Sequence, residues 1–210
     1  MEESTGKERF PLITALLIAT NVLAFLYTEW QGSTLDADYM IRAGAMYGPA
    51  FLGEHEYYRI FTHFFLHFGF EHLLNNMVSL LVLGYALENG IGRLCFGGIY
   101  FFSGVFSGLV SAFSLEFSGE GVTVVSCGAS GAIYGLMGAL LVMLVVNRKN
   151  NLKKQIPRFM LYIALSLYSG NQDPGIDNMA HIGGFVGGIL ICLMMCILKR
   201  IFSYRKEQVI

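Results

Sequence analysis

The sequence predicts an all-α membrane protein, a bundle of six transmembrane helices with a first outer loop that is partly membrane-embedded. Hydrophobic residues make up 54% of the 210 residues and charged residues only 14%, whereas soluble domains carry about 25% charged residues. The mean hydropathy is +0.55, and apolar runs near membrane-spanning length recur along the chain. Because lipid offers no hydrogen-bond partners to the backbone, such runs are expected to be helical. The net charge of −1 gives no indication of a nucleic-acid partner, and none is expected.

Six apolar segments are expected to cross the membrane. In chain order they cover residues 11–27, 73–87, 94–117, 129–146, 156–168 and 179–198. The fifth segment is short, which suits a helix with little tilt or a mobile helix at one edge. The expected organisation is a short cytoplasmic tail over residues 1–9, one membrane domain over residues 10–200 and a cytoplasmic C-terminal tail over residues 201–210.

Lysine and arginine gather at alternate ends of these segments. They lie before the first segment, between the second and third, between the fourth and fifth, and after the sixth: Lys7, Arg9, Arg93, Arg148, Lys149, Lys153, Lys154, Arg158, Lys199, Arg200, Arg205 and Lys206. By the positive-inside rule both termini are expected in the cytoplasm. The loop over residues 29–70 then lies on the outer side, and its length and many aromatic residues predict that it folds back into the membrane interface.

Polar side chains that are costly in lipid occur near the outer ends of three segments. The second segment carries His72 and Asn76, four residues apart and therefore on one helical face. The fourth carries Ser130 and Tyr134 with the same spacing, and the sixth carries His181. Intramembrane ionisable groups are functional candidates. The topology therefore predicts that these groups meet at a similar depth.

A serine and a histidine that meet in this way are typical of acyl transfer. Neutral His181 would take the proton of Ser130 during attack on a carbonyl and pass it to the leaving amine. The side chains of His72 and Asn76 and the backbone N–H of Ser130 would stabilise the oxyanion. Tyr134 would stack against the His181 ring.

No acidic residue occupies an evident third position of a catalytic triad. Asp173 and Asp177 lie in the loop before His181, but nothing in the sequence fixes them there. A Ser-His dyad is therefore preferred.

Glycines predict close approach of the fourth and sixth segments. In the sixth, Gly184 and Gly188 form a small-residue stripe near the His181 face, with a second stripe at Gly183 and Gly187. Small residues let membrane helices pack backbone to backbone. Generic helix packing is the simpler explanation of these glycines taken alone.

Each candidate residue also has a structural interpretation. Ser130 is one of many serines in membrane helices, His181 is as suited to a helix–helix hydrogen bond, and the His72–Asn76 pair can simply join helices. None of these structural interpretations explains why the polar groups would lie at one depth in the membrane. The shared depth therefore weakens all of them together. The remaining histidines, His55, His63 and His67, are interpreted as loop or interfacial residues. The cysteines lack metal-ligand spacing, and neither a metal site nor a cofactor is expected.

Several motifs together resemble the rhomboid family of intramembrane serine proteases. They are Gly128-Ala129-Ser130-Gly131 with Tyr134, Ala180-His181-x-x-Gly184 with Gly188, His72-x-x-x-Asn76, and Glu88-x-x-x-Gly92. Two positions depart from the family pattern. Tyr58-Arg59 stands where the family has Trp-Arg, and Cys127 stands where a glycine is frequent.

The resemblance implies roles for these residues. Ser130 would be the nucleophile, His181 the general base, and His72 and Asn76 the oxyanion-site groups. Gly128 would lie in the loop leading to the nucleophile, and Tyr134 would pack against the histidine. The implied substrates are single-span membrane proteins, cut in or beside the transmembrane segment from within the lipid bilayer. A minimal bacterial form in the plasma membrane is expected, with its site opening to the outer side; the oligomeric state is undetermined.

Two other functions remain open at this level. A catalytically inactive relative would use the same fold to bind membrane proteins as a chaperone, although it would be expected to lack the serine or the histidine. A small transporter would line a pathway with the polar groups, but neither inverted repeats nor interrupted helices are evident.

Overall fold

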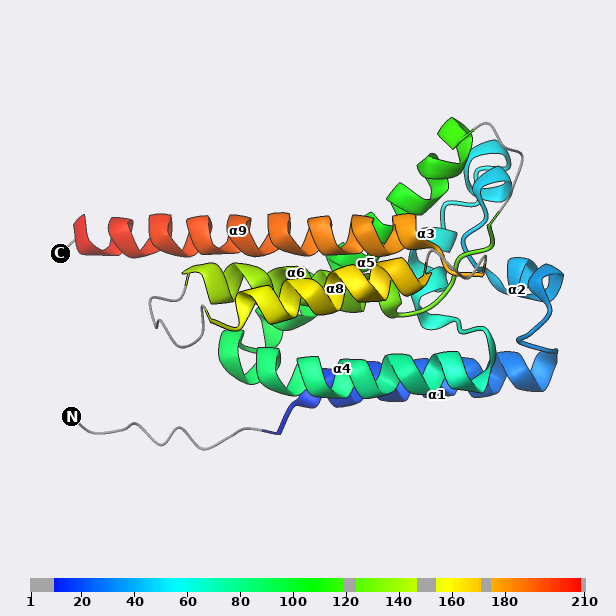
Figure 1. Ribbon diagram of the computed structural model, residues 1–210, viewed down its shortest axis with the longest axis horizontal. Helices are drawn as coiled ribbons and strands as arrows, with labels where there is room; N and C mark the ends of the chain where they lie inside the picture. The colour runs from blue at the N-terminus through cyan, green and yellow to red at the C-terminus, as the bar shows by residue number, and fades with distance from the viewer. Residues whose placement is uncertain (1–9, 119–123, 147–153, 171–174, 209–210) are drawn as a thin grey trace.

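The chain folds into an all-α membrane bundle, shown by a computed structural model that describes residues 10–118, 124–146, 154–170 and 175–208 (Figure 1). Its long helices are α1 (Leu12–Gln31), α4 (Gly69–Ile91), α5 (Arg93–Ser118), α6 (Ser130–Val146), α8 (Ile156–Gly170) and α9 (Asn178–Gln208). Short helical turns fill the connection between α1 and α4: α2 (Ala37–Ala43), η1 (Pro49–Gly53), α3 (Arg59–Thr62) and η2 (His63–Phe65).

Each expected membrane segment corresponds to one long helix, although the first and fourth segments begin one residue before their helices. By length and composition, three stretches among the described residues are long and apolar enough to cross a membrane: residues 12–31, 93–114 and 178–198. Helix α6 is apolar but shorter. Several helices extend beyond the expected segments: α1 continues to Gln31, α4 begins at Gly69, and α9 runs on to Gln208.

The short turns between α1 and α4 gather at one end of the bundle. The start of α1 and the end of α9 lie at the opposite end (Figure 1). This arrangement matches the expected alternation of the segments.

Helix α6 is the centre of the bundle. Its residues from Gly131 to Ala139 are all buried, and its hydrophobicity is nearly uniform around the helix. A helix that is apolar on every side belongs in the interior. Helices α9 and α5 are its most extensive neighbours, α4 and α8 also contact it, and α1 packs mainly on α4.

Glycines set the distance between α6 and α9. A Cβ atom added to Gly184 would lie 1.9 Å from the carbonyl oxygen of Gly131, and one added to Gly188 would lie 1.9 Å from that of Gly135. The two backbones are therefore in direct contact, which only the absence of side chains permits. This contact carries Ser130 and His181, at the starts of the two helices, toward each other.

The buried carboxylate of Glu88 holds together the start of α1 and the end of α4, at the end of the bundle opposite the short turns (Figure 1). Its oxygens accept hydrogen bonds from the backbone N–H groups of Ile13 and Thr14 at 3.0 and 2.8 Å, and from the Thr14 hydroxyl at 2.8 Å. The two backbone N–H groups are available because they lie in the first turn of α1, where no preceding turn supplies a carbonyl acceptor. Helix α4 ends at Ile91 and is capped by Gly92, whose φ of +89° is a conformation that favours glycine.

The loop between α1 and α4 is folded around the buried guanidinium of Arg59. It donates hydrogen bonds to the carbonyl oxygens of Ile41 and Ala45 at 2.6 and 2.7 Å and pairs with the Glu56 carboxylate. The loop is also tied to the segment that precedes α6, because Met46 and Ser126 exchange backbone hydrogen bonds of 2.8 and 2.9 Å. The loop thus braces the approach to Ser130.

Candidate active site

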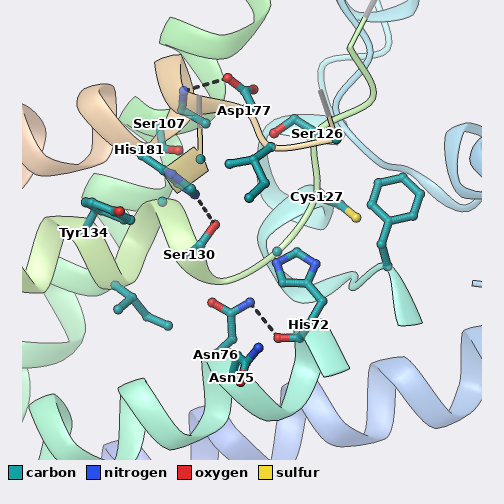
Figure 2. A pocket seen from close by; sticks show the side chains of 18 of the residues that line it. His72, Asn75, Asn76, Ser107, Ser126, Cys127, Ser130, Tyr134, Asp177 and His181 are labelled. Carbon is teal, nitrogen blue, oxygen red and sulfur yellow. Dashed lines mark hydrogen bonds between the residues drawn. The ribbon is translucent and has the colours of Figure 1, made fainter. Parts of the chain in front are cut away.

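Ser130 and His181 are in hydrogen-bond contact. The Oγ atom of Ser130, the first residue of α6, lies 2.9 Å from Nε2 of His181, in the first turn of α9 (Figure 2). If the hydroxyl donates to Nε2, the ring proton is on Nδ1. That geometry is the one a general base needs in order to accept the proton of a serine nucleophile.

The Tyr134 ring lies flat against the His181 ring. The two ring centroids are 4.4 Å apart with an interplanar angle of 14°. The Tyr134 hydroxyl is fixed in turn by a 2.6 Å hydrogen bond with Oγ of Ser166 on α8. Stacking on one face leaves the imidazole little freedom to rotate away from Ser130. Sequence reasoning missed Ser166, because no local pattern relates α8 to α6.

These groups line a large cavity of about 1090 Å³. Helices α4, α6, α8 and α9 contribute to its walls, together with the segment before α6. A helix of 17 residues is about 25 Å long, and a bilayer core is about 30 Å thick. With the Val146 end of α6 at the inner interface, Ser130 would lie inside the membrane, within a cavity that has ample room for water.

His72 and Asn76 face the segment that leads to Ser130. The Asn76 amide donates a 3.0 Å hydrogen bond to the carbonyl oxygen of His72, which orients it on the inner face of α4. Gly128 has φ +129°, and a Cβ there would lie 2.7 Å from the His72 ring and 3.7 Å from the Asn76 amide nitrogen. Glycine is therefore required at 128 both for its backbone angle and for this close approach. Asn75, which the sequence did not single out, also lines the cavity.

The loop histidines have more specific positions than the sequence indicated. His63 and His67 lie in the loop between α1 and α4, as expected, but they are buried. Nε2 of His67 accepts a 3.3 Å hydrogen bond from the backbone N–H of Ala129, and the backbone carbonyl of His63 accepts one of 2.9 Å from Gly128.

Burial lowers the pKa of His67 to about 3, so its ring is neutral at pH 7 and can act as an acceptor. The two histidines therefore hold the segment before Ser130. In the sequence, the signal for this shared role was the spacing of the two histidines, four residues apart within an aromatic run.

Two aspartates, Asp173 and Asp177, precede His181 in the chain. Asp173 lies outside the described residues. Asp177 caps α9, since its Oδ1 accepts a 2.9 Å hydrogen bond from the Ala180 backbone N–H. Among the described residues, no group of three or more metal-ligating side chains occurs.

Comparison with known proteins places these features in a family. A model described as the Rhomboid domain matches residues 54–198. Rhomboid protease GluP of Bacillus subtilis is 33% identical over 178 residues, which cover 85% of this chain and 34% of that protein. RHOMBOID-like protein 7 of Arabidopsis thaliana is 33% identical over 169 residues, covering 80% of this chain and 52% of that protein.

Rhomboid protease AarA of Providencia stuartii is 32% identical over 214 aligned positions, covering 90% of this chain and 75% of that protein. The chain thus spans between a third and about half of the length of the first curated relatives that it matches.

Proposed function

This chain belongs to the rhomboid family, and we propose on that premise that it is an intramembrane serine endopeptidase. Its substrates would be single-span membrane proteins, cut in or next to their transmembrane segment through a Ser130–His181 dyad and an acyl-enzyme. The observation that carries the proposal is the 2.9 Å contact between Ser130 Oγ and His181 Nε2 inside a cavity of a membrane bundle. The proposed location is a bacterial plasma membrane, with both termini cytoplasmic and the cavity open to the outer side.

The reaction would begin with attack of Ser130 Oγ on the scissile carbonyl carbon. His181 Nε2 would take the hydroxyl proton as the C–O bond forms, and would donate it to the leaving amine as the C–N bond breaks. A water molecule in the cavity would then attack the acyl-enzyme, losing its proton to His181, and release the second product. Tyr134 would keep the imidazole in place through both halves of the reaction.

The negative charge that forms on the carbonyl oxygen needs donors on the side of Ser130 that faces α4. The Asn76 amide retains a second N–H beyond the one bonded to His72, and His72 lies beside Gly128. The Ser130 backbone N–H opens α6 and has no preceding turn to bond with. Three donors of this kind would stabilise the tetrahedral intermediate.

The proposed activity is tested with the purified 210-residue chain in liposomes with a single-span model substrate. The substrate has small residues and a helix-weakening residue near its outer membrane boundary. We expect two fragments, with a cut mapped by mass spectrometry within or beside the transmembrane segment. A well-folded chain that binds the substrate and leaves it intact would instead support the inactive membrane-protein binder.

Lateral entry of substrate is proposed between α4 and α8. Helix α8 packs mainly on α6 and α9, and most of its large apolar residues are exposed: Met160, Leu161, Tyr162, Leu165 and Tyr168. It nevertheless forms a wall of the cavity through Tyr162, Leu165, Ser166 and Ser169. A weakly packed wall is the element best suited to move aside.

Joining α4 to α8 is expected to block cleavage of the membrane substrate. Cysteines replace the cavity-lining Ser79 and Tyr162, in a background where the exposed Cys196 is alanine, and a bifunctional reagent connects them. Labelling of Ser130 by a small fluorophosphonate is expected to persist, because that reagent does not need the gate. The variants that carry only one of the two introduced cysteines in the same background, treated with the same reagent, serve as controls for reaction at the remaining native cysteines. Unchanged cleavage by the fully cross-linked chain would rule out this route.

A further inference from the structure

The proton on His181 Nδ1 faces a buried position without a hydrogen-bond partner. Among the described residues, Nδ1 of His181 has no hydrogen bond, although the atom is inaccessible to solvent. When Nε2 takes the serine proton, this ring becomes a buried cation. A buried charge is costly unless another charge or dipole compensates it. The imidazolium form of His181 therefore needs a nearby group that stabilises its positive charge.

The cavity wall has few candidates for this compensation. Its described lining contains no lysine or arginine, and its only acidic residues are Glu71 and Asp177. Glu71 is exposed at the start of α4. Asp177 lies one helical turn before His181 on the same chain segment, at the start of α9 (Figure 2). Asp177 is thus the carboxylate that the fold brings to the histidine.

The Asp177 carboxylate is held by donors from two helices. Its Oδ1 atom accepts the 2.9 Å hydrogen bond from the Ala180 N–H, and Oδ2 accepts a 2.5 Å hydrogen bond from the hydroxyl of Ser111. Ser111 is a buried residue of α5, and it bonds to Asp177 across 66 positions in the sequence. A carboxylate fixed on both oxygens is preorganised and does not have to reorient when charge forms nearby.

The other groups that face His181 are neutral. Ser130 and Tyr134 contact it from α6, and Ser107, Tyr162, His63 and His72 line the same cavity from α5, α8, η2 and α4. Burial lowers the pKa of His63 to about 4, so this loop ring is neutral at pH 7. The negative charge of Asp177 therefore acts on His181 with no lysine or arginine in the described cavity lining to cancel the effect.

We propose that Asp177 is a positioning residue of the Ser130–His181 dyad, a third acidic member that acts on the imidazole by its charge without touching it, and that Ser111 locks it in place. This inference rests on the proposed protease function. Asp177 favours the protonated form of His181 and so stabilises the transition state. Its helix cap fixes the height of the ring relative to Ser130.

The test compares Asp177→Asn with the unchanged chain in cleavage of the single-span model substrate from pH 4 to pH 9. Asparagine caps a helix as well as aspartate does, so the variant removes the charge and keeps the cap. We expect the acid limb of kcat/KM to move about one pH unit lower and the plateau to fall about tenfold. A residue that only caps the helix would lower activity equally at every pH.

Matched variants separate charge from structure. Asp38→Asn removes an exposed carboxylate from α2 on the same side of the bundle, outside the cavity, and is expected to change neither feature of the profile. Ser111→Ala keeps the charge but frees one oxygen, so we expect the same direction of change with smaller size. If thermal unfolding shows that Asp177→Asn is not folded, Asp177→Ser supplies a second neutral cap.

Two failures of this experiment have different meanings. If the unchanged chain does not cleave, the protease function itself is wrong. If it cleaves and Asp177→Asn retains both the wild-type acid limb and the wild-type plateau, the protease function stands and the role of Asp177 is rejected. A uniform fall at every pH with no shift of the limb also rejects it.

Discussion

Replacing Ser130 with alanine is expected to reduce cleavage of a single-span substrate by about 10⁴-fold or more, to the background of the assay. The hydroxyl is the group in contact with His181 Nε2, and no other hydroxyl among the described residues is hydrogen-bonded to that ring. The measurement is the initial rate of fragment formation in liposomes, with the folded state checked by thermal unfolding. A small change is expected in stability, because alanine fits the space that serine occupies.

The same prediction has a chemical readout that needs no substrate. A fluorophosphonate is expected to label Ser130 in the unchanged chain, to leave Ser130→Ala unlabelled, and to label His181→Ala far more slowly. Because the two residues act as one unit, the double variant should be no worse than either single variant. Ser114→Ala is a matched control, since that hydroxyl bonds only the backbone of its own helix at Ser111. Substantial cleavage by folded Ser130→Ala would overturn the assigned nucleophile.

Replacing Gly188 with alanine is expected to lower the free energy of unfolding by about 3 kcal/mol, the upper part of the range for overpacking a tight core. The new Cβ would lie 1.9 Å from the carbonyl oxygen and 2.5 Å from the carbonyl carbon of Gly135. Both are backbone atoms of the central helix α6, so no side-chain rotation relieves the clash. The two helices must separate, and the Ser130–His181 contact should lengthen with them.

The measurement is thermal unfolding in detergent together with the cleavage rate. Gly90→Ala is the matched control, because its Cβ would meet only the terminal methyl of Met143 at 3.5 Å. In a helix that change is expected to be neutral or stabilising by up to about 1 kcal/mol. Equal stability of the two variants would show that the close packing of α6 and α9 does not require glycine at 188.

The class of fold and the location of the site were accessible from local patterns. Apolar length predicts membrane helices, and the alternation of lysine and arginine predicts which ends of the helices lie together. Once alternate ends are paired, Ser130 and His181 must lie at the same end of the bundle. The glycines also predict close approach of the fourth and sixth segments; the structure shows which residues meet, since Gly184 and Gly188 contact Gly131 and Gly135.

The supporting contacts were not accessible in this way. His63 and His67 were predicted as loop or interfacial residues; they lie in the loop, yet they are buried and hold the backbone before Ser130. The sequence also could not identify the hydrogen-bond partners of three polar residues, Ser111, Ser166 and Asp177. Each of them bonds to a group from another helix or fixes a helix end. A polar residue in an apolar segment indicates that some partner exists, but not which one.

The sequence by itself determined that this chain is a membrane bundle and that a hydroxyl and an imidazole gather near one surface of it. Hydropathy, charge alternation and helical periodicity are short-range properties, so they can be read from neighbouring residues. Only the tertiary structure decided that Ser130 Oγ lies 2.9 Å from His181 Nε2, with Tyr134 stacked on the ring and Asp177 tied to Ser111. Those contacts depend on the rotation and separation of helices that are distant in the chain, which the packing of the whole bundle sets.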